Sequence, residues 1–163
     1  MNNEEIMTSV ELEIILKAGK ILLSSGAEIS RTEDTMNYIA RAMNFKDLEA
    51  YVSNRGIFAT AKKADGTEIT RICNVPEVDI NLSKIESVNA LSRRVTQKNI
   101  TIEEIESELN QIHTMSDYSF FWRLVAYTLG ASGFSYAIGS SITDSIIAGI
   151  IGLVLGIYVC TIK

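Results

Sequence analysis

Apolar residues recur every three or four positions in two stretches near the start of the chain, and this spacing predicts two amphipathic helices. The first covers about 8–24 and the second about 31–43. Gly26 can end the first helix because glycine takes the left-handed conformation without steric cost. Ser30 and Glu33 have the S-x-x-E spacing of a capping box, which predicts the start of the second helix. The apolar stripes consist of Val10, Ile14, Ala18 and Ile21, and of Met36, Ile39, Ala40 and Met43.

After Asn44 the pattern changes to short segments rich in β-branched and aromatic residues, which are typical of strands. Asp65-Gly66 lies between two of these segments, and this dipeptide is a strong local signal for a hairpin. The pattern therefore predicts a three-stranded antiparallel meander over about 48–75, closed by Pro76.

Two further apolar stripes predict two more helices after the meander. Thr101 and Glu104 have capping-box spacing at the start of the last one. Residues 1–117 are therefore predicted to form an α+β domain with four helices plus a small antiparallel β-meander, large enough for its own core. The stripes consist of Leu82, Ile85, Val88, Leu91 and Val95, and of Ile102, Ile105, Leu109 and Ile112.

Charge divides the chain near Asp117. Of the twenty acidic and fifteen basic residues, only Arg123, Asp144 and Lys163 lie beyond that point. Residues 118–163 are otherwise apolar or small.

Two apolar runs in this second part are long enough to cross a bilayer, since about 20 residues suffice. We expect two α-helical transmembrane spans, at about 119–138 and 142–162, which begin a larger bundle. The alternative is a buried helical hairpin in a soluble core, but the second run is apolar on every face, which favours the membrane. Gly152 and Gly156 form a small-xxx-small pair, which is typical of closely packed membrane helices.

The composition argues against several classes of function. The N-terminus has no basic region of the kind that opens a signal peptide, so we expect the first domain to stay in the cytoplasm. That domain is acidic and has a single basic pair, Arg93-Arg94, so we expect no nucleic-acid partner. Two cysteines and one histidine argue against a structural metal site. With no phosphate-binding loop, dinucleotide fingerprint, nucleophile elbow or zinc-protease motif, we predict no cofactor, no catalytic residue and no enzyme activity.

The turn between the first two helices carries the first candidate site, at Glu28, Arg31 and Glu33, with Asp34 beside them. The positive end of the second helix explains Glu33 and Asp34, but helix capping explains neither Glu28 nor Arg31. A surface ion pair is the structural alternative. The functional alternative is a site for a zwitterionic ligand, in which the arginine binds a carboxylate and an acid binds an amine.

Arg123 and Asp144 form the second candidate site, because ionisable residues at membrane depth indicate a transport path or a pairing partner. Each has a structural alternative as well. Arg123 can extend its guanidinium to the membrane surface, and Asp144 can cap its own helix.

The stretch "LLSSGAEISRTEDTMNYIARAMNF" resembles the opening signature of the threonine/serine exporter family, in the N-terminal half of its split two-subunit type. Gly26, Ala27, Arg31 and Glu33 match that signature. The likeness continues through "TRICNV" and "INLSKIESVNALSRR". It reaches the last part of the chain, where a small-residue bend and an acid, here Asp144, precede the second apolar run.

The resemblance implies a transporter subunit in the cell (plasma or inner) membrane, multi-pass, with a cytoplasmic N-terminal domain. Its substrate would be threonine, serine or a similar amino or dicarboxylic acid, and its partners the lipid bilayer and a second membrane subunit or further copies of itself. Because the sequence has no ATP-binding motif, we expect a proton or ion gradient to drive export, with Asp144 as the proton carrier. The alternative function is a membrane-tethered ligand-binding or regulatory domain without transport activity, which would use the cluster at Glu28, Arg31 and Glu33.

Overall fold

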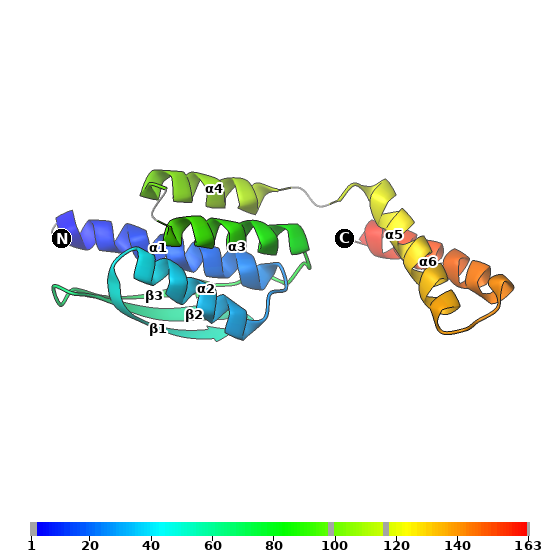
Figure 1. The fold of residues 1–163 in the computed structure, drawn as a ribbon, viewed down its shortest axis with the longest axis horizontal. Coiled ribbons are helices and arrows are strands. Elements are labelled where there is room, and N and C mark those ends of the chain that lie inside the picture. Colours follow the sequence, from blue (N-terminus) through cyan, green and yellow to red (C-terminus); the bar gives the residue numbers. More distant parts are fainter. Residues whose placement is uncertain (1–2, 98–99, 116–117, 163) are drawn as a thin grey trace. The chain divides into compact units, whose positions relative to one another are not determined.

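Figure 1 shows the fold of the computed structural model, which describes residues 3–97, 100–115 and 118–162. The chain divides into two compact units, Met1–Met115 and Ser116–Lys163. The elements of the first unit are α1 (Asn3–Ser24), α2 (Ile29–Ala42), β1 (Phe45–Ser53), β2 (Gly56–Lys63), β3 (Glu68–Asn74), α3 (Leu82–Thr96) and α4 (Ile102–Thr114). Those of the second unit are α5 (Phe120–Ala137) and α6 (Ile142–Ile162).

The helix α1 is the central element of the first unit, since it packs against α2, α3, α4 and the strands β2 and β3. A helix with neighbours on several sides must be apolar on several sides. Three of the predicted stripe residues, Ile14, Ala18 and Ile21, are buried as expected, whereas Val10 is 39% exposed. The buried apolar residues of α1 are Leu12, Ile14, Ile15, Leu16, Ala18, Ile21, Leu22 and Leu23.

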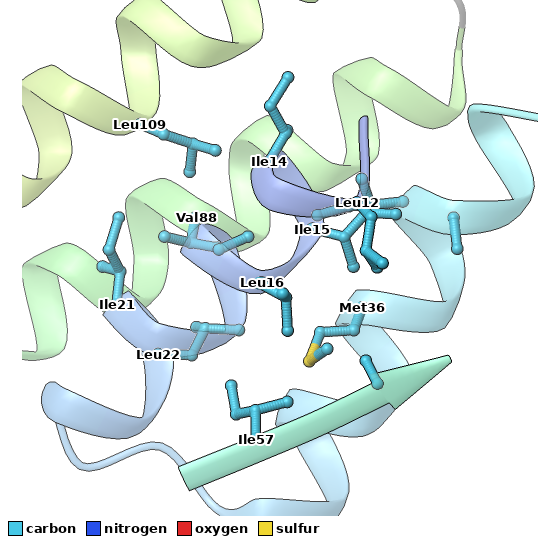
Figure 2. Packing of buried hydrophobic residues seen from close by; sticks show 14 of the residues in the cluster. Leu12, Ile14, Ile15, Leu16, Ile21, Leu22, Met36, Ile57, Val88 and Leu109 are labelled. Atoms are coloured by element: carbon cyan, nitrogen blue, oxygen red, sulfur yellow. The ribbon is translucent and has the colours of Figure 1, made fainter. Parts of the chain in front are cut away.

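The core lies where α1 meets the elements around it. Figure 2 shows Met36 of α2 and Ile57 of β2 close to α1, with Val88 and Leu109 supplied by α3 and α4. Gly19 permits the close approach of α1 to α2 and β2, because a Cβ added there would lie 2.6 Å from the Sδ of Met36 and 3.0 Å from the Cδ1 of Ile57. The helices α3 and α4 lie on the side of α1 away from the sheet (Figure 1).

The sheet is a three-stranded antiparallel meander in the order β1-β2-β3, as the sequence pattern predicts. The predicted hairpin at Asp65-Gly66 is confirmed. The Lys63 amide donates to the Thr67 carbonyl at 2.9 Å, and Gly66 has a φ of +92°, a value that glycine tolerates best. The Asp65 carboxylate accepts a hydrogen bond from the Thr67 amide at 2.8 Å, which lowers the pKa of Asp65.

The predicted helix boundaries have different outcomes. Gly26 ends α1 as expected, with a φ of +84°. The capping box of α4 is confirmed as well: the Thr101 hydroxyl accepts from the Glu104 amide, and the Glu104 carboxylate accepts from the Thr101 amide at 2.8 Å.

The predicted capping box at Ser30 and Glu33 is wrong. The helix α2 begins at Ile29, directly after Glu28, whose backbone is extended. Ser30 therefore lies inside the first helical turn, where it cannot have the extended backbone that a capping residue needs. The Thr32 hydroxyl donates to the Glu28 carbonyl at 3.0 Å within that turn.

The second unit is a pair of helices that approach each other through small residues. The buried residues of α6 are Ser145, Gly149, Gly152 and Gly156, whereas its large apolar side chains are mostly exposed within the chain. A Cβ added at Gly152 would lie 2.6 Å from the carbonyl oxygen of Tyr127 in α5. Contact between the two helices therefore depends on the missing side chain.

The predicted fold class, a cytoplasmic α+β domain followed by two transmembrane spans, is wrong. Among the described residues, only α6 is long and apolar enough to cross a membrane, and it is a single candidate span. The first apolar run forms α5, which is less apolar, because Arg123 and several Ser, Thr and Tyr residues interrupt it.

Candidate functional site

The candidate residues of the first unit lie at the start of α2. Glu28 precedes the helix, Arg31 is in its first turn, and both are exposed. Glu33 is half-buried, and its carbonyl accepts a hydrogen bond from the Asn37 amide group at 3.1 Å. Within the described ranges, no ion pair joins Arg31 to Glu28, Glu33 or Asp34. The interpretation of this turn as a surface ion pair is therefore wrong.

Arg31 instead lines a hollow of about 280 Å³ between α2 and α3. The lining positions on each helix are three or four residues apart, so they share one face of that helix. Every lining residue has a polar or charged side chain. The lining residues are Arg31, Asp34, Thr35 and Tyr38 from α2 and Asn89, Ser92 and Arg93 from α3.

Two arginines from different helices, Arg31 and Arg93, therefore line one hollow. In the part of the chain that the structure describes, neither Arg31 nor Arg93 forms an ion pair. The carboxylate of Asp34 is the single acidic group of the lining. Because arginine keeps its charge at every physiological pH, the hollow has an excess of one positive charge.

A second groove, between α3 and α4, provides a contrast on the same helix. Its lining includes Arg94 and Glu108, which form an ion pair across the groove. The hydrogen bond that the Arg94 guanidinium donates to the Glu108 carboxylate raises the pKa of Arg94. The charges of this groove therefore satisfy each other, whereas those of the hollow at Arg31 and Arg93 do not.

Sequence reasoning missed Arg93 and Asn89, although a signal for them was present. Polar residues recur at 89, 92, 93 and at 31, 34, 35, 38, which are stripes of helical spacing next to the apolar ones. Arg93-Arg94 was considered only as a basic pair for nucleic acid. The structure assigns its two members to different grooves.

The other candidates lie in the second unit. Arg123 is half-buried in the first turn of α5, and Asp144 is exposed in the first turn of α6. Asp144 does not cap its helix itself. Ser141 does so, because its hydroxyl accepts from the Asp144 amide at 3.2 Å and donates to the Asp144 carboxylate at 2.7 Å. Among the described residues, no group of His, Cys, Asp or Glu side chains is arranged to hold a metal ion.

A family model described as "ThrE: Putative threonine/serine exporter" matches residues 13–162, which include most of both units. The chain belongs to the threonine/serine exporter family. The resemblance seen in the sequence is thereby confirmed. Searches of curated proteins and of solved structures found no match to the chain.

The threonine/serine exporter family is a family of transporters, not of enzymes. Membership implies a role in amino-acid export, association with a membrane and a small-molecule substrate. The helix α6 provides one candidate for the membrane contact of such a protein.

Proposed function

We propose that the chain is a gradient-driven secondary transporter subunit that exports threonine, serine or a similar amino or dicarboxylic acid through the cell membrane. The match of the exporter family over residues 13–162 carries this proposal. We place the first unit in the cytoplasm and α6 in the bilayer.

A transport path needs more than this pair of helices, since one candidate span cannot enclose a path for a polar solute. We propose that a second membrane subunit, or further copies of the chain, completes it. The exposed apolar side chains of α6 and its buried glycines support helix packing in lipid.

Asp144 is our candidate for the coupling residue, because a carboxylate near the end of an apolar helix can take up and release a proton. Its carboxylate accepts a hydrogen bond from the Ser141 hydroxyl at 2.7 Å. Arg123 is the second charge of this unit within the described residues. It is our candidate for attracting the substrate carboxylate.

The test uses the native host from which the gene has been deleted, so that any partner subunit is present. Cells complemented with the wild-type chain or with Asp144→Asn are loaded with threonine, and efflux is measured at equal membrane content. Asparagine can still accept the Ser141 hydrogen bond but cannot carry a proton, so we expect normal insertion and strongly reduced efflux.

Ser141→Ala is the matched control, because it removes the cap and leaves the carboxylate. We expect it to lower stability by about 1 kcal/mol and to retain most of the efflux. Wild-type efflux from Asp144→Asn would exclude the proton role of this residue. Equal efflux with and without the chain would instead favour the second candidate function, a membrane-tethered ligand-binding domain. The hollow at Arg31 and Arg93 supports that candidate.

A further inference from the structure

We infer that the hollow between α2 and α3 binds a small amino-dicarboxylic acid, such as aspartate or glutamate. The inference concerns a ligand site in the first unit, and it holds whether or not the chain exports threonine. It deepens the ligand-binding function considered above by naming the class of ligand.

The charges of the lining lead to this class. Arg31 and Arg93 contribute two guanidinium groups, and Asp34 contributes one carboxylate. Guanidinium groups bind carboxylates through two parallel hydrogen bonds, and a carboxylate binds an ammonium group. A molecule with two carboxylates and one ammonium group satisfies all three side chains and cancels the excess positive charge.

The remaining lining residues suit a polar molecule of this size. Tyr38 and Asn89 offer further hydrogen-bond donors and acceptors. The Ser92 hydroxyl already donates its hydrogen bond to the Asn89 carbonyl, at 2.9 Å. A hollow of about 280 Å³ has room for a small organic acid together with several water molecules, since each water takes about 30 Å³.

The groove between α3 and α4 shows why we assign the ligand site to the hollow and not to the Arg93-Arg94 pair as a whole. Arg94 follows Arg93 directly in the chain, but its guanidinium is bound by Glu108. Arg93, one position earlier, forms no ion pair with an acidic residue among the described residues, and it lines the hollow between α2 and α3 instead. The two arginines therefore form a matched pair for an experiment.

The experiment is isothermal titration calorimetry on the full chain in lipid nanodiscs. The ligands are L-aspartate, L-glutamate, succinate, which lacks the ammonium group, and L-asparagine, which lacks the second carboxylate. We expect aspartate or glutamate to bind most tightly, and succinate and asparagine to bind about tenfold more weakly.

The variants separate the site from a general effect of charge. Arg31→Gln and Arg93→Gln should each weaken aspartate binding by about tenfold or more, whereas Arg94→Gln should change it by less than about twofold. Asp34→Asn should weaken the binding of aspartate but not that of succinate. These side chains are exposed, and thermal unfolding followed by circular dichroism checks that each variant is folded.

Three results would overturn the inference. The first is the absence of binding by every ligand. The second is an equal loss in Arg93→Gln and Arg94→Gln, which would indicate a general attraction of anions. The third is asparagine binding as tightly as aspartate, which would remove the need for two guanidinium groups. Equal threonine efflux with and without the chain, together with intact aspartate binding, would contradict the transport proposal alone.

Discussion

The two units of the chain are stabilised in opposite ways. The first buries large apolar side chains from α1, α2, α3, α4 and the sheet around one central helix. The second buries small residues, and it leaves side chains such as Leu129, Phe134 and Ile151 more than 60% exposed within the chain. Burial of apolar area drives packing in water, whereas helices in lipid associate by close backbone approach. This difference supports the proposal that the first unit folds in water and that α6 lies in the bilayer.

The largest expected effect comes from adding a side chain at one of the glycines of α6 that pack against α5, which are Gly149, Gly152 and Gly156. Gly152→Leu should abolish the packing of α5 on α6, because even a Cβ at this position would lie 2.6 Å from the Tyr127 carbonyl oxygen and 2.7 Å from the Ala131 Cβ. Heat stability of the purified chain in detergent measures the effect. Gly130→Leu is the control, since nothing lies within 4 Å of a Cβ added there. Equal stability of the two variants would contradict the claim that α5 packs closely against α6 at Gly152.

An intermediate effect is expected from truncating the core of the first unit. Leu109→Ala should lower the free energy of unfolding of this unit by about 2–5 kcal/mol, because Leu109 is completely buried and the deletion leaves a cavity. Urea unfolding followed by circular dichroism measures the change.

Leu82→Ala is the matched control for the core, since Leu82 is 72% exposed. We expect a change within about 0.5 kcal/mol. A loss in Leu82→Ala as large as that in Leu109→Ala would show that burial does not decide stability in this unit.

How far the sequence predicts this fold depends on the range of the interactions. The hairpin at Asp65-Gly66, the end of α1 at Gly26 and the box at Thr101 are local, so neighbouring residues suffice to predict them. The start of α2 is local as well, but the N-cap position is occupied by Glu28, whereas the S-x-x-E spacing predicted Ser30.

The remaining features depend on parts of the chain that are distant in sequence. The central position of α1 follows from the neighbours that it acquires on folding, which one apolar stripe does not reveal. The hollow joins Arg31 to Arg93, which lie on different helices, so sequence reasoning found only the first half of it. Arg123 made α5 too polar to count as a candidate span, although the run around it is mostly apolar.

The smallest expected effect concerns pH and the β2–β3 turn of the first unit. The hydrogen bond from the Thr67 amide lowers the pKa of Asp65, so the fold favours its charged form. Its contribution is therefore complete above the ordinary pKa of an aspartate and is lost as the pH falls through the lowered value. Asp65→Asn should make stability less dependent on pH between about pH 5 and pH 2. An unchanged pH profile would show that this bond contributes nothing.

The proposal that the first unit lies in water and α6 in lipid is tested most directly by labelling single cysteines with a membrane-impermeant maleimide in cells. Both native cysteines are first replaced, by Cys73→Ser and Cys160→Ser. Ala64→Cys then marks the exposed β2–β3 turn, and Ile151→Cys marks the middle of α6.

We expect no labelling of Ala64→Cys in intact cells and complete labelling after lysis, since we propose a cytoplasmic location for the first unit. Ile151→Cys should stay unlabelled after lysis and react only in detergent or denaturant, since we propose that α6 lies in the bilayer. Labelling of Ala64→Cys in intact cells would place the first unit outside. If Ile151→Cys reacted after lysis without detergent or denaturant, and as fast as Ala64→Cys, α6 would lie in water. That result would contradict the proposal that α6 lies in the bilayer.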